Sequence, residues 1–186
     1  SEMQELQETY LPLTEHLLEE EPSQFDYEYE EFLKSIKTAL FFSEWIEEKE
    51  EEYLLEKYGV RPGELHTKLD ICDWLLYAAG ELARLKGYTE LLTEQAKLRV
   101  RLKYGAKEEL LALLRLKDIG RIRARKLYAN GIKDLGDVRS ADTLKLSQLL
   151  GPAVAKSIKE QVGQEVKEVP KGKRKGQTSL QKYKPS

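Results

Sequence analysis

The chain has 186 residues, of which 40% are hydrophobic and 34% are charged, enough for one medium domain or two small ones. No apolar run approaches the roughly 18 residues that a membrane span needs, and the acidic start lacks the apolar core of a signal peptide, so we expect a cytoplasmic protein without a membrane partner. A single cysteine, Cys72, excludes an internal disulfide, and two distant histidines, His16 and His66, predict no zinc site.

The net charge of −2 hides an uneven distribution of charge along the chain. The first 114 residues carry 13 Lys and Arg against 26 Asp and Glu, whereas the remaining residues carry 18 against 7. An acidic body therefore precedes a basic C-terminal third. Such a basic region is the electrostatic footprint expected of a nucleic-acid-binding segment, although the average charge conceals it.

The whole chain has helical periodicity, because apolar residues recur at steps of three and four and no segment alternates with period two. We therefore predict an all-α protein. Its first domain is an acidic helical bundle over residues 1–114. The helices expected in it cover 1–20 (with Pro12 as a candidate break), 27–47, 50–58, 62–85, 89–103 and 107–114.

The pattern changes after Leu116 to short helices separated by glycines. A second domain is expected over residues 115–163, with helices at 121–129, 134–138, 141–149 and 152–162. Residues 164–186 form a third segment that is rich in Lys, Gly and Pro. This tail has too little apolar content to pack, so we expect it to be disordered until it binds a partner.

The segment IGRIRARKLYANGI, residues 119–132, is the clearest candidate binding site. Gly120 opens a helix, and the first N–H groups of a helix lack intrahelical partners and suit a phosphate. Four cations surround this turn: Arg121, Arg123, Arg125 and Lys126. Their clustering favours a nucleic-acid backbone as the bound anion.

A second segment repeats the spacing of the first. Both follow Gly-x-x-x-Ala-x-x-(Leu/Ile), in Gly120, Ala124, Leu127 and in Gly151, Ala155, Ile158. The spacing resembles the helix-hairpin-helix fold, which holds DNA phosphates on backbone amides without reading sequence. That family has Gly-hydrophobic-Gly, but Asp118 occupies the first glycine position here, and the second unit has Leu150 and lacks cationic neighbours. The alternative is that one or both hairpins only pack.

The helix beginning at Pro62 carries an aromatic residue opposite its apolar stripe. The stripe lies within about 40° of one line and consists of Leu65, Leu69, Cys72, Leu76, Ala79 and Ala83. Trp74 lies about 180° from it and is a candidate stacking platform for a base. The alternative is a central helix buried on two sides, which Ile71 and Leu85 would support. Trp45 is expected in the core.

Several segments preceding the hairpin motif point to a family. Together with IGRIRARKLYANGI, the segments ALFFSEWIEE, KYGVRPGEL and DWLLYAAGELARL resemble the C-terminal region of the archaeal Hjm helicases, over residues 5–163. These are superfamily-two, helicase-Q-like DNA helicases. The resemblance implies a ratchet domain in which Trp74 stacks on a base, followed by a hairpin domain that grips the emerging strand. The family's arginine two turns before the tryptophan is replaced by Thr67, with Lys68 beside it as a candidate substitute.

The chain lacks a phosphate loop and an acidic metal motif, so we assign it no catalytic, cofactor-binding or metal-binding residue. The resemblance places ATP and Mg²⁺ in the motor domains of a parent helicase, of which this chain is an excised fragment or a truncated relative. The function it implies is the non-motor part of a helicase in replication-fork repair and recombination. Its implied partners are single-stranded or branched DNA and the motor domains in cis, at the nucleoid.

The tail carries a second, weaker motif. Gln177, Leu180 and Tyr183 are spaced like the sliding-clamp-binding peptide, although Lys184 stands where a second aromatic is usual. The alternative is a solvated basic tail. An adaptor that docks a sliding clamp or recombination proteins is the second functional hypothesis. A hairpin-class DNA glycosylase is a remote third, because Asp137 and Asp142 lack a Gly-Pro-Asp context.

Overall fold

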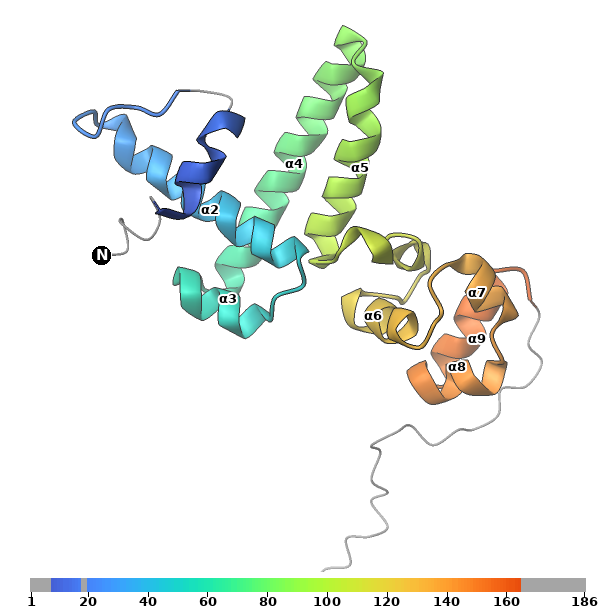
Figure 1. The fold of residues 1–186 in the computed structure, drawn as a ribbon. Coiled ribbons are helices and arrows are strands. Elements are labelled where there is room, and N and C mark those ends of the chain that lie inside the picture. Colours follow the sequence, from blue (N-terminus) through green and yellow to red (C-terminus); the bar gives the residue numbers. More distant parts are fainter. Residues whose placement is uncertain (1–7, 18–19, 165–186) are drawn as a thin grey trace, which may run out of the picture. The chain divides into compact units, whose positions relative to one another are not determined.

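The computed structural model describes residues 8–17 and 20–164, and all regular structure within these ranges is helical, which confirms the all-α prediction (Figure 1). None of the helices in these ranges is long and apolar enough to cross a membrane. The chain divides into two compact units, residues 1–105 and 106–186, whereas the sequence analysis placed its boundary after residue 114. The predicted tail, with Gln177, Leu180 and Tyr183, lies outside the described residues except for its first residue, Gln164.

Within the described residues, a short α-helical stretch at 8–10 precedes one 3-10 helix and four α-helices of the first unit. They are η1 (Leu11–His16), α2 (Glu28–Ile46), α3 (Glu51–Tyr58), α4 (Pro62–Lys86) and α5 (Thr89–Tyr104). Gly59, Gly87 and Gly105 end the last three with left-handed backbones, as their sequence positions predicted. Pro62 begins α4, and the Glu64 carboxylate accepts a hydrogen bond of 2.9 Å from the Arg61 N–H.

The helix expected over residues 1–20, with Pro12 as a candidate break, does not continue as one α-helix in the described part of that range, because α-helical residues 8–10 are followed by a 3-10 helix from Leu11. Pro12 lies in the first turn of a 3-10 helix, and Leu17 is extended at its end, with φ −70° and ψ 140°. Proline lacks the N–H that a continuing α-helix would need. The nearby Tyr10 is instead buried against α2 in a small cluster with Tyr29, Leu33 and Ile36.

The main core of the first unit gathers residues from α2, α3, α4 and α5: Phe41, Trp45, Leu54, Tyr58, Leu65 and Leu102. Trp45 is buried as predicted, and its indole N–H donates a 2.7 Å hydrogen bond to the Leu102 carbonyl. This bond joins the end of α2 to the end of α5. It satisfies the one polar atom that the buried indole carries.

Helices α4 and α5 lie side by side as a long hairpin (Figure 1). Leu65, Leu69, Cys72 and Leu76 face the core, as the predicted stripe requires. The predicted stripe fails at Ala79, whose side chain is exposed. Its neighbour Gly80 is buried instead, against the Gln95 side chain of α5. Beyond Leu76 the helix extends past the core of α2 and α3, and α5 becomes its partner.

The second unit is built from short helices around its own core. They are η2 (Glu108–Leu110), η3 (Leu113–Arg115), α6 (Arg121–Ala129), α7 (Leu135–Ser140), α8 (Thr143–Leu150) and α9 (Pro152–Gln161). The helix predicted over 107–114 is wrong, since two 3-10 turns replace it. A segment of eight residues is too short to be helical by propensity alone, and here burial of Leu110, Leu113 and Leu114 determines its path.

One lysine of this unit is structural. Lys159 is 3% exposed, and its ammonium donates to the carbonyls of Arg139 and Ala141 at 2.8 and 2.5 Å and to the Gln164 side chain at 2.8 Å. Desolvation lowers its pKa, and the charge of Asp142 opposes that shift. The ammonium thus caps the C-terminal end of α7, where orphan carbonyls need donors.

Candidate nucleic-acid interface

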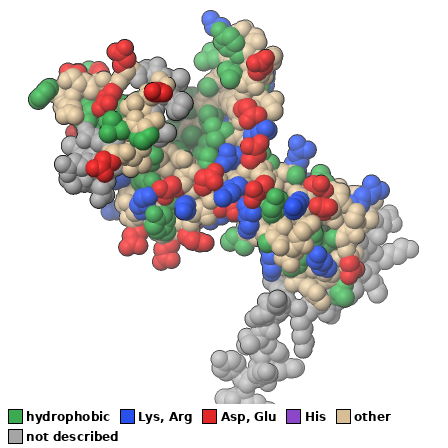
Figure 2. Space-filling view, in the orientation of Figure 1, with side chains coloured by type: hydrophobic (Ala, Val, Ile, Leu, Met, Phe, Trp, Pro, Cys, Tyr) green, Lys and Arg blue, Asp and Glu red, His purple; other side chains and the backbone are tan. Residues whose placement is uncertain are grey.

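Trp74 projects from α4 away from the core and is 65% exposed. Ile71, Leu82 and Leu85 are exposed within about 80° of Trp74 around α4, and the exposed Leu75 lies about 100° from it. Figure 2 shows hydrophobic side chains at the surface of the α4–α5 hairpin. The alternative that Trp74 is buried between two layers is therefore not realised within the described part of the chain. An exposed apolar helix face of this length is available for a ligand or partner.

The position two turns before Trp74 provides no cation. Thr67 stands there, and its hydroxyl donates a 3.2 Å hydrogen bond to the Gly63 carbonyl within the helix. Lys68 is half-buried and lies about 120° around the helix from Trp74, because six residues correspond to one and two-thirds turns. The structure therefore places Lys68 on a different side of α4 from the tryptophan. It lines a cavity together with Lys34 and Lys37 of α2.

A carboxylate on the opposite flank of α4 is neutralised by α5. Asp73 accepts two hydrogen bonds from the Arg99 guanidinium, at 2.7 and 2.8 Å, and the guanidinium also lies over the Tyr77 ring at 5.2 Å. The hydrogen bonds from Arg99 lower the pKa of Asp73 and those to Asp73 raise the pKa of Arg99. This bidentate pair fixes α5 against α4 and removes one negative charge from the hairpin surface.

The first hairpin of the second unit has an unusual backbone. Gly120 caps α6 with an extended conformation, φ −102° and ψ −176°, and its carbonyl accepts from the Ala124 N–H at 2.9 Å. Asp118, which occupies the family's glycine position, has φ +65°. Its carbonyl accepts a 2.6 Å hydrogen bond from the Arg123 guanidinium. The loop therefore has the left-handed turn that a glycine would allow, but with a carboxylate at its tip.

The predicted cations lie together on α6, but they differ in their surroundings. Arg123 and Lys126 are exposed, and Arg121 is half-buried. Arg125 pairs with Glu109 at 2.7 Å and lies over the Tyr128 ring at 5.3 Å. Glu109 and Tyr128 were missed by the sequence analysis, because only the fold brings η2 next to α6. The cluster offers Arg123 and Lys126 most directly to an anion.

The second hairpin is packed as the repeated spacing predicted. Ala155 and Ile158 are fully buried, as are Ala124 and Leu127 of the first unit. Gly151 has φ +93° and precedes Pro152 at the start of α9. This backbone conformation favours glycine. Within the described residues no group of three His, Cys, Asp or Glu side chains is placed to hold a metal ion.

The chain is similar to known proteins over most of its length. Residues 1–105 match the family model described as archaeal helicase, domain 4. The chain is 36% identical over 87% of its length to the ATP-dependent DNA helicase Hel308 of Pyrococcus abyssi, and 39% identical over 72% to that of Methanocaldococcus jannaschii. It is 36% identical over 94% of its length to the Thermococcus kodakarensis protein of the same name. The chain spans only 23%, 11% and 16% of these three relatives.

Proposed function

This chain belongs to the archaeal superfamily-two DNA helicases, as part of their C-terminal region, and we propose that it is the non-motor DNA-binding part of an ATP-dependent helicase. The parent enzyme would act on single-stranded and forked DNA in replication-fork repair and recombination, at the nucleoid. Its motor domains, in cis, would hold ATP and Mg²⁺. The observation that carries the proposal is the exposed Trp74 on α4, since a solvent-facing indole opposite a core stripe is suited to base stacking.

The second unit would supply a helix-hairpin-helix contact with the phosphate backbone. Its support is the pair of equally spaced glycine turns, with buried Ala124 and Ala155 that let the helices approach closely. The first hairpin would bind through Arg121, Arg123 and Lys126, and Asp118 would weaken it. The second hairpin lacks a cluster of cations like that on α6, so it would contribute mainly packing.

The exposed face of α4 beyond Trp74 would contact the motor domains. Leu82 and Leu85 are exposed on the part of α4 that extends past the core, and Leu85 is 85% exposed. Most of each relative's length lies outside the matched region, so a large partner in cis is expected. The predicted sliding-clamp contact of the tail stays a proposal that rests on Gln177, Leu180 and Tyr183 alone.

Tryptophan fluorescence tests the stacking role. Oligothymidine should quench Trp74, whereas Trp45 is buried with its N–H bonded to Leu102 and serves as an unquenched internal reference. Trp74→Ala should weaken binding by about 1–3 kcal/mol without changing the melting temperature, because the side chain is exposed. Tyr88→Ala removes another exposed aromatic and is the matched control. Quenching that is absent, or an unchanged affinity of Trp74→Ala, would refute the proposal.

The hairpin role has its own test. Replacing Arg121, Arg123 and Arg125 together by Ala should weaken DNA binding and flatten its dependence on salt by up to about three counterions. The change should be smaller if the pairing of Arg125 with Glu109 persists in the complex. A matched triple replacement of Lys86, Lys97 and Lys103 lowers the net charge equally outside the hairpin. Equal effects of the two triple variants would contradict a specific hairpin contact.

A further inference from the structure

A small cavity of the first unit is bordered by cations from two helices. It has a volume of about 270 Å³ and lies between α2, the α3–α4 turn and the first turns of α4. The buried rings of Phe41 and Tyr58 line it, and Lys34, Lys37 and Lys68 border it. Lys37 and Lys68 are half-buried, and both line the cavity.

The cavity is rich in positive charge, whereas the first unit as a whole is acidic. Residues 1–105 contain 12 Lys and Arg against 24 Asp and Glu, yet three of those 12 cations line this one cavity. Glu64 is the carboxylate in the lining, and it accepts a hydrogen bond from the Arg61 N–H. The lining thus carries three ammonium groups against one carboxylate, which favours an anion as the ligand.

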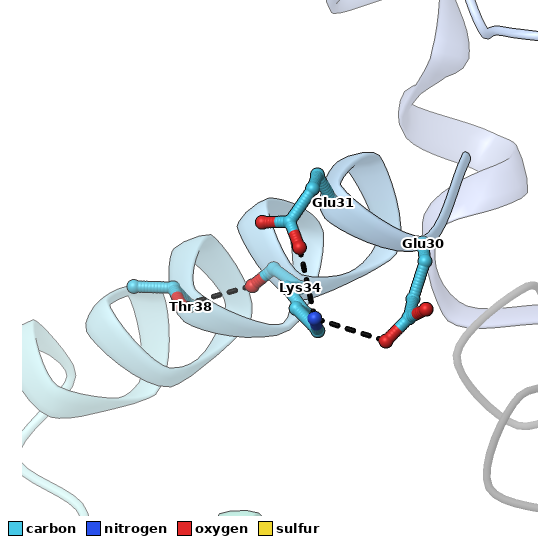
Figure 3. Close-up of polar contacts among 4 residues, drawn as sticks. All are labelled: Glu30, Glu31, Lys34 and Thr38. Carbon is cyan, nitrogen blue, oxygen red and sulfur yellow. Dashed lines mark hydrogen bonds and ion pairs between the residues drawn. The ribbon is translucent and has the colours of Figure 1, made fainter. Parts of the chain in front are cut away.

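Lys34 is held by carboxylates outside the cavity. Figure 3 shows its ammonium between Glu30 and Glu31, each at 2.9 Å, while the Thr38 hydroxyl donates to the Lys34 carbonyl. Hydrogen bonds to Glu31 and then Glu30 raise the pKa of Lys34, so it stays protonated. All three side chains are largely exposed, and exposed ion pairs of this kind contribute little. An incoming anion can therefore compete with both glutamates.

We propose that this cavity binds one backbone phosphate of a single-stranded nucleic acid that also stacks on Trp74. The proposal rests on the function proposed above. Lys68 lies about 9 Å along α4 from Trp74 and about 120° around it. The exposed side chains of Ile71 and Leu75 lie on the helix surface between them. A strand stacked on Trp74 thus crosses an apolar surface and then reaches the cations of the cavity.

The salt dependence of oligothymidine binding tests this phosphate contact. In the full chain, Lys37→Ala/Lys68→Ala should flatten the slope of log Kobs against log salt by about 0.7, the value for one phosphate of a single strand. The control Lys86→Ala/Lys97→Ala lowers the net charge equally outside the cavity and should leave the slope unchanged. Glu30→Gln/Glu31→Gln releases Lys34 from its ion pairs and should tighten binding at low salt.

A second measurement, by amide NMR, distinguishes a strand phosphate from a free anion as the ligand. It also distinguishes binding at the cavity from stacking on Trp74. In amide NMR spectra, Lys37, Thr38, Gly59 and Lys68 should shift on titration with oligothymidine, and inorganic phosphate at the same concentration should not reproduce the shifts. Equal shifts with inorganic phosphate would overturn the strand assignment. The phosphate contact at the cavity would be refuted, and the stacking role would stand, if oligothymidine quenched Trp74 but shifted none of these amides and if the double variant kept its salt slope. No response at either place would refute both.

Discussion

Asp118, at the tip of the first hairpin, has a left-handed backbone and a carboxylate beside the proposed phosphate site. Its substitution by glycine is expected to raise both the stability of the protein and its affinity for DNA. Its φ of +65° costs a residue with a side chain roughly 1–2 kcal/mol, whereas glycine adopts this conformation freely. Because glycine has more backbone freedom in the unfolded chain, about 0.5–1 kcal/mol of that gain is lost. The substitution also removes a long hydrogen bond, 3.4 Å, that the Ser157 hydroxyl donates to the Asp118 carboxylate. Because Asp tolerates this conformation better than most residues, Asp118→Gly should raise the free energy of unfolding by at most about 1 kcal/mol.

The same substitution removes a carboxylate from the proposed phosphate site. Repulsion between two exposed unit charges a few ångströms apart is on the order of 1 kcal/mol, which corresponds to about fivefold in affinity at low salt. Asp118→Asn separates the two effects, because asparagine tolerates the left-handed backbone and lacks the charge. Both variants should bind DNA more tightly, with the gain fading at high salt, while only Asp118→Gly should gain stability.

Urea denaturation and fluorescence anisotropy of labelled oligothymidine measure these two quantities independently. If Asp118→Asn bound no more tightly than the parent chain, the carboxylate would not face the phosphate. If Asp118→Gly were no more stable than Asp118→Asn, the backbone at this position would carry no strain. Either result would refute the corresponding half of the reasoning.

Two further predictions concern stability. Gly105→Ala should cost about 2–4 kcal/mol by urea denaturation, because it adds overpacking to a left-handed backbone, φ +58°: the new Cβ would lie 2.5 Å from the buried Trp45 ring. Gly87→Ala, with φ +80° and no atom within 4 Å of its Cβ, should cost only about 1 kcal/mol, and equal costs would contradict the packing argument. Lys159→Met should cost about 2–3 kcal/mol, because it leaves two helix-end carbonyls without their donor, and the exposed Lys156→Met should stay within about 0.5 kcal/mol.

The parts of the fold that depend on local chemistry could be predicted from the sequence. Gly59, Gly87 and Gly105 end their helices because a left-handed residue stops the ladder of hydrogen bonds wherever it stands. The burial of Trp45 followed from its place on the apolar side of α2. The exposure of Trp74 was one of two alternatives, since helical periodicity gives the direction of a side chain but not what covers it.

Features that depend on a distant segment could not be predicted in this way. Burial of Gly80 instead of Ala79 requires α5 as a neighbour, and the sequence does not reveal where α4 leaves the core. Arg125 and Arg123 are equivalent in sequence terms, yet Arg125 pairs with Glu109 while Arg123 donates to the Asp118 carbonyl. Lys68 was expected to substitute for the family's arginine because it neighbours Thr67, but one residue along a helix is a rotation of 100°.

In the proposed function the two units would offer a strand different kinds of binding energy, and this difference would have a consequence for the parent enzyme. Stacking on Trp74 releases no counterions and is tolerant of base sequence, whereas contacts of arginines with phosphates weaken steeply as salt rises. A stacked base must be released and replaced at each step of translocation, so a contact worth a few kcal/mol suits a helix that lets the strand slide. Phosphate contacts on the hairpin would not require a base to unstack at each step, and the carboxylate of Asp118 would keep them weak. Weak phosphate contacts together with a renewable stacking contact would hold the strand without stopping it.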